Sequence, residues 1–556
     1  MLNSKLIPCA LLAITHSVFA QQLPSAGSQL QQIPPAPVPQ RAQPAILPVP
    51  VAPVTEAGDV ASVKITVQRL AVSGSTAYAE NALLAATGFV PGSNLSLDEL
   101  RAMAAKIAAY YHRNGYFLAQ AYLPEQDIQS GVVTIAVLEG RYGKVALRNN
   151  SAVSDAVAYG LLGGLNNDDM IAVEPLEHRL LLLSDLPGVQ VKSTLVPGAS
   201  VGASDLIVEL TPGQRISGSV DADNAGNRYT GRARGGATVN LNEPTGHGDV
   251  ATLRVLTSGS GLNYARLSYQ AHIGNATAGV AYSALRYQLG REFAPLDADG
   301  KAAIASVYGS YPLIRSRNSN LYVQLNADAK RFSDELGVTS SVTDKHAHVL
   351  IASLVGDHRD RLGGGGLTSA ALAWSSGKID LQTASLRAFD TISADSNGHY
   401  NKLSLNATRQ QSLTDTVSLY AAINGQMASK NLDVSEKMEL GGMYGVRAYP
   451  EGEAYADQGY VINLEARVDL QRLTNVVPGQ LQLIGFVDHG SVTTNKNPWT
   501  AGSNHRTLSG AGVGLVWGGN SNVVVKTYYA YRLGNEKALS APDSASRFWV
   551  QAVKYF

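Results

Sequence analysis

The chain has 556 residues, with 44 basic and 44 acidic side chains, so its formal net charge is zero. Charged residues make up only 16% of the sequence, against about 25% in an ordinary soluble domain. The charge balance disfavours nucleic-acid binding, which needs a basic surface, and the low charge indicates that neutral polar groups cover much of the protein.

Residues 1–20 have the pattern of a secretory signal peptide. Lys5 supplies a positive charge, residues 6–14 are mostly apolar, and Val18-Phe19-Ala20 resembles a cleavage site. Cys9, the only cysteine of the chain, lies inside this segment. A mature protein without a thiol excludes disulfide frameworks, thiolate metal sites and cysteine nucleophiles.

Residues 21–61 follow as a proline-rich linker that cannot build a core, with a weak indication of a short helix at residues 25–33. No later segment has a run of about 18 apolar residues, so the sequence predicts no transmembrane helix. Such an exported chain is either soluble or crosses a bilayer as a closed β-barrel, because an open sheet leaves backbone groups unpaired in lipid.

Residues 62–140 are predicted to form a small α+β domain. Its main helix spans residues 97–112, where apolar side chains recur at helical spacing before Asn114-Gly115. Strands are predicted at residues 63–67, 116–123 and 132–138. Residues 141–213 repeat the order strand, helix, helix, strand, strand, so the sequence predicts two copies of one module.

From Gln214 to Phe556, apolar and polar residues alternate, as in residues 265–273 and 460–470. A soluble sandwich shares this alternation, but strands of roughly 9–11 residues suit a tilted passage through lipid. The turns are unequal, some tight and others long, such as residues 334–346, which is typical of outer-membrane barrels. The segment is therefore predicted to close as a transmembrane barrel of about 16 strands.

Two motifs in the barrel resemble those of the two-partner secretion transporters, the haemolysin secretion/activation family of the Omp85 superfamily. Residues 440–452, LGGMYGVRAYPEG, are similar to the VRGY segment of that family's long loop between strands 11 and 12. Residues 485–490, GFVDHG, resemble its F-x-D motif on a following strand. The start of the barrel at residues 223–231 and the first hairpin at residues 243–249 are also similar.

The resemblance implies a mainly β protein with α+β modules. Two periplasmic POTRA (polypeptide-transport-associated) domains, residues 62–140 and 141–213, would precede a 16-stranded barrel in the bacterial outer membrane, residues 214–556. The POTRA domains would bind a large, unfolded, exported β-helical partner, such as an adhesin or haemolysin, which the barrel would move to the cell surface. The alternatives are an Omp85-type insertase and a passive porin. Activation of the partner and a plug helix in the lumen stay open.

The resemblance also implies a contact inside the barrel. In the family, the long loop folds into the lumen and its arginine pairs with an aspartate of the inner wall. The matching loop residues are Gly445, Val446, Arg447, Ala448 and Tyr449, and the matching wall residues are Phe486, Asp488 and Gly490. Arg447 and Asp488 would form a bidentate pair that either controls the loop or only ties it down. Ala448 replaces the family's glycine and would be strained in a left-handed backbone.

Partner-binding candidates lie in the first repeat, because sheet-edge domains bind extended chains by adding a strand. They are Leu100 and Ile107 on the helix, and Leu118 and Tyr122 on the next strand. Leu100, Ile107 and Leu118 could instead be ordinary core. Phe556 ends a last strand and resembles the signal that the outer-membrane assembly machinery reads. Outer-membrane lipid and that machinery are further implied partners.

Neither an enzyme, a cofactor nor a metal site is expected. Residues 198–202, GASVG, match a serine nucleophile elbow, but they lie between two predicted strands, whereas the elbow needs a strand-to-helix turn. His346, His348 and His358 are predicted to be solvated side chains of a surface loop and strand.

Overall fold

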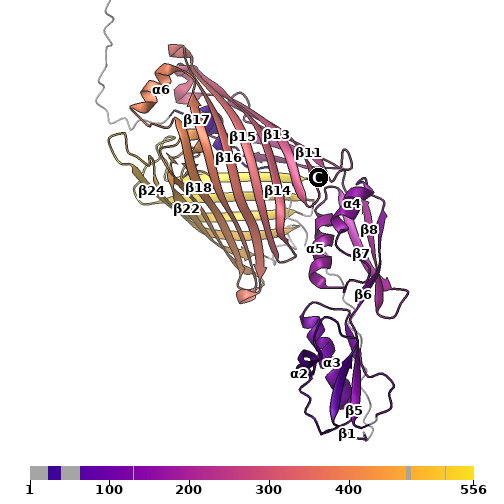
Figure 1. Cartoon of the computed structure of the whole chain (residues 1–556). Coiled ribbons are helices and arrows are strands. Elements are labelled where there is room, and N and C mark those ends of the chain that lie inside the picture. Colours follow the sequence, from indigo (N-terminus) through magenta and orange to yellow (C-terminus); the bar gives the residue numbers. More distant parts are fainter. Residues whose placement is uncertain (1–22, 39–62, 129, 471–477, 520) are drawn as a thin grey trace, which may run out of the picture.

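The structure, a computed structural model, describes residues 23–38, 63–128, 130–470, 478–519 and 521–556. The predicted signal peptide and most of the linker lie outside the described residues. Two small α+β modules lie in tandem at one end of a closed barrel (Figure 1). Within the described ranges, no helix is long and apolar enough to cross a membrane.

The first module packs two helices against a three-stranded sheet. Its elements are β1 (Ile65–Val67), β2 (Arg69–Ser73), α2 (Glu80–Thr87), β3 (Ser93–Leu95), α3 (Leu97–Arg113), β4 (Gln120–Tyr122) and β5 (Val132–Leu138). The sheet order is β2-β5-β4, so β2 and β4 are its edges, while β1 pairs with β3. Helix α3 begins after Ser96, whose side chain and Glu99 form a capping box.

The second module has the predicted order of strand, two helices and two strands. Its elements are β6 (Arg141–Asn149), α4 (Asp155–Leu162), α5 (Val173–Ser184), β7 (Val189–Pro197) and β8 (Ala203–Pro212), with the sheet order β6-β8-β7. The serine motif at residues 198–202 lies in the turn between β7 and β8, so it is followed by a strand and not by a helix.

One buried carboxylate, Glu139, joins the two modules. It accepts hydrogen bonds from the backbone N–H groups of Thr76 (2.6 Å) and Ala77 (2.7 Å), from the Tyr111 hydroxyl (2.9 Å) and from Arg141 of the second module (2.9 Å). Desolvation alone would raise the pKa of Glu139, but the hydrogen bonds from Thr76, Ala77 and Tyr111 outweigh it and lower the pKa to about 2. The junction therefore keeps its charge at neutral pH.

The barrel has the predicted 16 strands, each antiparallel to the next, and its last strand pairs with its first. The strands are β9 (Ile216–Asp223), β10 (Arg234–Asn242), β11 (Val250–Thr257), β12 (Leu262–Ile273), β13 (Ala276–Gln288), β14 (Ala298–Arg315), β15 (Ser319–Leu336), β16 (Ser341–Asp360), β17 (Gly366–Leu381), β18 (Gly398–Ser412), β19 (Val417–Ala428), β22 (Gln458–Asp469), β23 (Gln480–Thr493), β24 (His505–Gly519), β25 (Val523–Leu533) and β26 (Ser546–Tyr555).

Strand lengths differ more than the sequence predicts. β9, β10 and β11 have 8 or 9 residues, whereas β15 has 18 and β16 has 20. The long turn predicted at residues 334–346 is wrong, because both strands continue into it and only a short 3₁₀ turn, Gly337–Thr339, joins them. The end of a strand that extends into water on both faces loses the alternation of apolar and polar residues by which strands are recognised.

The second module is docked against the turns at one end of the barrel. Arg315, at the end of β14, forms a bidentate pair with Asp185 at the end of α5, with Nε–Oδ2 and Nη2–Oδ1 distances of 2.7 and 2.8 Å. The backbone N–H of Ser154 donates to the Gly246 carbonyl at 2.8 Å. These contacts fix which end of the barrel faces the modules.

Candidate functional site

The long segment between β19 and β22, residues 429–457, is called the lumen loop here. It joins strands 11 and 12 of the barrel and contains a 3₁₀ turn (Val434–Glu436) and two short paired strands, β20 (Met438–Glu439) and β21 (Tyr455–Ala456). From Leu440 to the end of the loop, every residue except Tyr444 is buried or half-buried, and the apolar ones pack on strands of the inner wall. The loop therefore occupies the lumen.

At the tip of the lumen loop, Arg447 meets Asp488 of β23. Arg447 Nε and Nη2 donate to the two carboxylate oxygens of Asp488 at 2.9 and 2.7 Å, and the Arg447 backbone N–H donates to the same group at 3.0 Å. Asp488 is 0% exposed and Arg447 is 4% exposed. The structure thus brings together the two residues that the sequence paired.

The guanidinium of Arg447 has further partners that the motifs do not reveal. Its Nη1 donates to Glu465 of β22 at 2.7 Å. The guanidinium carbon lies 3.6 Å from the centroid of the Phe486 ring and 5.0 Å from the centroid of the Tyr528 ring. The cation is therefore placed against two aromatic faces. On the last strand, Trp549 Nε1 donates to the Arg447 carbonyl at 2.7 Å. The tip is therefore bound by four strands.

The other motif residues shape the tip. A side chain at Gly445 would clash with the backbone carbonyls of Gly441 and Leu440, so this position needs glycine, whereas one at Gly490 would displace the Leu440 side chain of the loop. Val446 is fully buried, and the Tyr449 hydroxyl donates to the Glu536 carbonyl at 2.9 Å.

The strain predicted at Ala448 is wrong. Ala448 is not one of the described residues whose backbone is left-handed. Its methyl group instead packs against β24, where a side chain at Gly510 would lie 2.6 Å from the Ala448 Cβ. The glycine on the wall makes room for the alanine in the loop.

The base of the lumen loop has a second set of ion pairs, which the sequence analysis missed. Glu436 accepts from Lys330 of β15 at 2.7 Å and from Lys402 of β18 at 2.9 Å. Asp433 accepts from Lys345 of β16 at 2.9 and 2.8 Å. Three lysines on three strands thus hold two carboxylates, a pattern with no fixed spacing in the sequence.

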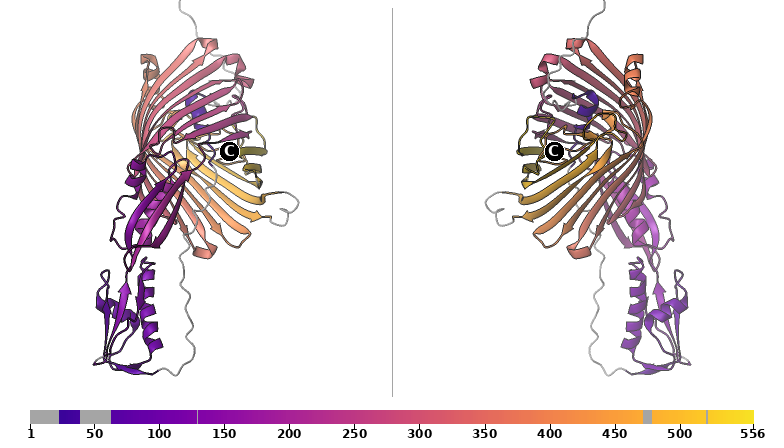
Figure 2. Two further views of the ribbon diagram at one scale, coloured as in Figure 1. Left: turned by 90° about the vertical axis from the view of Figure 1, so that its right-hand side faces the viewer. Right: turned by 90° about the vertical axis from the view of Figure 1, so that its left-hand side faces the viewer.

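A short helix, α1 (Ala26–Gln31), lies inside the barrel against this base (Figure 2). Gln31 donates to the Val434 carbonyl at 2.7 Å, and the Ala26 N–H donates to Asp334 of β15 at 2.7 Å. Thr230 donates to Gln29 at 2.7 Å. The helix that the sequence indicated only weakly at residues 25–33 is present and sits in the lumen.

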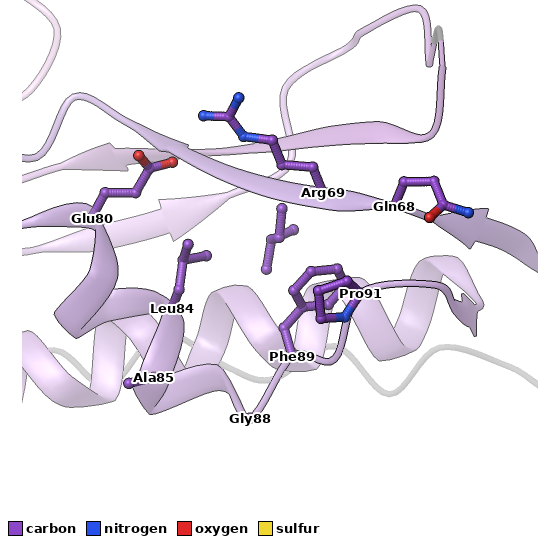
Figure 3. Close-up of a pocket in the computed structure, with 9 residues that line it drawn as sticks. Gln68, Arg69, Glu80, Leu84, Ala85, Gly88, Phe89 and Pro91 are labelled. Atoms are coloured by element: carbon purple, nitrogen blue, oxygen red, sulfur yellow. The ribbon is translucent and has the colours of Figure 1, made fainter.

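The first module carries a groove between its edge strand β2 and helix α2 (Figure 3). The groove has a volume of about 490 Å³, and its lining is Gln68, Arg69, Leu70, Glu80, Leu84, Ala85, Gly88, Phe89 and Pro91. Among the described strands, β2 pairs only with β5, and its Val72 N–H donates to the Glu80 side chain at 3.1 Å. An edge strand with a neighbouring apolar groove is suited to accept another strand.

The structure favours the core alternative for two of the four partner-binding candidates. Leu100 and Ile107 are buried in the first module, because they lie on the face of α3 that covers the sheet. Leu118 is half-buried against the second module, and only Tyr122 is well exposed.

The remaining predicted residues take no part in these sites. Phe556 pairs through its backbone with Gly218 of β9, next to the seam that closes the barrel. His346, His348 and His358 all lie on β16, and ten residues of extended strand, about 33 Å, separate the last two. The three histidines therefore do not form one site.

Comparisons with known proteins agree with this architecture. The family model of the haemolysin secretion/activation protein ShlB/FhaC/HecB matches residues 202–517, and that of the ShlB-type POTRA domain matches residues 65–140. The heme/hemopexin transporter protein HuxB of Haemophilus influenzae (strain 86-028NP) is 31% identical over 475 residues, which are 84% of this chain and 82% of that protein. The outer membrane transporter CdiB of Dickeya dadantii is 23% identical over 439 residues, 76% of this chain and 74% of that protein.

Two solved structures share the fold. CdiB from Escherichia coli matches with a TM-score of 0.71 at 19% identity, covering 92% of this chain and 94% of that chain. BamA from Haemophilus ducreyi lacking POTRA domains 1–3 matches with a TM-score of 0.55 at 14% identity, covering 88% of this chain and 100% of that chain. The chain belongs to the haemolysin secretion/activation family ShlB/FhaC/HecB and is a two-partner secretion transporter of the outer membrane, with its POTRA domains in the periplasm.

Proposed function

We propose that the groove of the first POTRA module captures an extended segment of an unfolded, exported, β-helical partner. The groove between β2 and α2 carries this proposal, because it combines a sheet edge with half-buried Leu84 and Phe89. Backbone hydrogen bonds along β2 would give affinity with little demand on sequence, which suits a partner that must stay unfolded.

A charge placed in the groove tests this proposal. Leu84→Asp should weaken binding of the unfolded partner to the full-length transporter at least tenfold, because it puts a carboxylate on the apolar floor. Ala105→Asp adds the same charge to an exposed position of α3 and should leave binding unchanged. Equal binding by both variants would contradict docking in the groove.

We further propose that the lumen loop and α1 must move during transport, which distinguishes the chain from a passive porin. Helix α1 and the lumen loop both occupy the barrel interior and contact each other at Val434. A polypeptide passing through the lumen would need the space that they fill. In this mechanism Arg447 and Asp488 control the loop as a latch that opens and closes.

A cross-link tests the movement of α1. Gln29→Cys and Thr230→Cys place two thiols at a contact of 2.7 Å between the native side chains, in a chain whose only native cysteine is Cys9. Joining them with a short bifunctional maleimide should abolish secretion, whereas each single variant treated alike should secrete normally. Normal secretion by the cross-linked protein would contradict displacement of α1.

We also propose which class of exported partner the chain transports. The chain is 31% identical to the heme/hemopexin transporter HuxB and 23% identical to the CdiB of Dickeya dadantii, which favours a partner of the class that HuxB exports. The chain should therefore restore secretion to cells that lack HuxB more effectively than to cells that lack CdiB. The reverse order would overturn this assignment.

We propose transport without catalysis, since the serine motif lies in a hairpin. Phe556 is proposed as the residue that the assembly machinery reads, and the apolar outward side chains of the barrel, such as Leu483 and Val487 of β23, as the contact with outer-membrane lipid.

A further inference from the structure

A polar cavity of about 620 Å³ lies at the end of the barrel opposite the POTRA modules. It is formed by the loops that follow β9, β11 and β13. Because β9 starts at the second module, these loops lie on the outer side of the membrane. The lining is Arg228, Tyr229, Thr230, Gly231, Arg232, Ala233, Ser258, Ser260, Gly261, Gln288, Leu289, Gly290 and Arg291.

The cavity has an excess of positive charge. Arg228, Arg232 and Arg291 line it, and none of the described lining residues is acidic. Arg228 is paired with Glu292, just outside the lining. In the described part of the chain, Arg232 and Arg291 have no carboxylate within ion-pair distance. Glu292 follows Arg291 in the sequence but is the ion-pair partner of Arg228, so the three lining arginines and this one acid leave a net charge of +2.

A fourth arginine, Arg547 at the start of β26, adds to this excess. Its charge interacts unfavourably with Arg232, and its Nε and Nη2 atoms are buried without a hydrogen-bond acceptor among the described residues. The acids that act on it from a distance are already paired, Asp543 with Arg532 and Glu453 with Arg506. Arg547 is not among the lining residues, so it adds positive potential beside the cavity rather than a direct contact, and that potential favours an anion there.

The level of the cavity relative to the bilayer indicates which kind of anion it binds. β9, β10 and β11 have 8 or 9 residues, at or below the roughly 9–11 residues that a tilted strand needs to cross the hydrocarbon layer. The loops after β9 and β11 therefore lie at the level of the lipid headgroups. The loop after β13, which joins longer strands of 13 and 18 residues, is held beside them by the Gly290 N–H, which donates to the Tyr229 carbonyl at 2.8 Å. An arginine fork matches the oxygens of a phosphate group.

We propose that this cavity binds a phosphate group of a phosphorylated glycolipid of the outer leaflet. Arg232 and Arg291 contact the phosphate, Arg547 supplies long-range charge, and the Ser260 hydroxyl can donate. The cavity shares Thr230 with the α1 contact, since that side chain donates to Gln29. A bound headgroup thus braces the loop that holds α1 in the lumen.

Native mass spectrometry of the full-length transporter in detergent tests the site. The probes are lipopolysaccharide, the same lipid after enzymatic removal of its phosphates, and inorganic phosphate. Wild type should retain phosphorylated lipid, and R232Q/R291Q should retain at least tenfold less at equal concentration. R359Q/R361Q removes two exposed arginines near the periplasmic turn after β16 and should bind like wild type.

Three results would overturn the proposal. The first is equal retention of lipid by R232Q/R291Q and wild type, with both shown to be folded by heat-dependent gel migration. The second is equal binding of the phosphorylated and dephosphorylated lipids. The third is binding of inorganic phosphate without binding of the lipid, which would assign the cavity to a free anion.

Discussion

Two of the places that hold the lumen loop use opposite chemistry. At the tip, one arginine is shared by two carboxylates, Asp488 and Glu465, under two aromatic rings. At the base, three lysines surround Glu436 and Asp433 beside α1. The rigid fork of arginine fixes an angle, whereas the ammonium of lysine is a point charge on a flexible stem. The tip is therefore the stiff attachment and the base the one that can yield first.

Removal of the ion pairs at the tip should cause the largest loss of stability. Arg447→Ala leaves the fully buried Asp488 without its cation, which should lower the free energy of unfolding by about 3–5 kcal/mol. Heat-dependent migration of the folded barrel on gels, followed with temperature, measures the loss. Arg286→Ala removes an exposed arginine that forms no ion pair in the described structure and should cost little.

A double variant separates the causes of that loss. Adding Asp488→Asn to Arg447→Ala removes the unpaired charge, so part of the stability should return. No recovery would show that the lost packing on Phe486, rather than the stranded carboxylate, dominates. Secretion that is lost at temperatures where Arg447→Ala is still folded would support control of the loop over simple bracing.

Weakening of the ion pairs at the base should cause a smaller loss of free energy, and this loss should be seen in the docking of α1. Glu436→Gln weakens the contacts to Lys330 and Lys402, whose side chains are 11% and 15% exposed and can turn towards lumen water. We expect a loss of about 2 kcal/mol in the docking of α1. Thiol labelling of a Ser28→Cys variant should become more than tenfold faster, since about 1.4 kcal/mol is a factor of ten.

Glu335→Gln is the matched control for the base, because Glu335 lies exposed on the neighbouring part of β15. Labelling of Ser28→Cys should keep its native rate in that background. Equal labelling rates in the Glu436→Gln and Glu335→Gln backgrounds would mean that the base does not hold α1, and the contrast between tip and base would fail.

The tip could be predicted from sequence and the base could not, for a physical reason. Arg447 and Asp488 lie in motifs whose neighbours, Gly445 and Gly490, are glycines at places where the chain is closely packed. Lys330, Lys345 and Lys402 are single charges on three long strands, and only the register of the barrel brings them together. The period-2 pattern predicted the barrel, but it could not reveal strands that extend above the lipid.

The smallest expected effect concerns the fit of Ala448 against Gly510. Gly510→Ala would put two Cβ atoms 2.6 Å apart, so it should cost about 1 kcal/mol by overpacking the tip, the lower end of the usual range. Ala448→Gly alone removes one buried methyl group and should cost about 1 kcal/mol. Heat-dependent gel migration measures both losses.

Combining the two substitutions tests whether the positions are complementary. The double variant should be more stable than Gly510→Ala, because the methyl group then moves from the loop to the wall. Gly485→Ala on β23 adds a methyl group with no neighbour within 4 Å and is the control. If the double variant were no better than Gly510→Ala, the two positions would not be complementary, and the stiffness of the tip would rest on Arg447 alone.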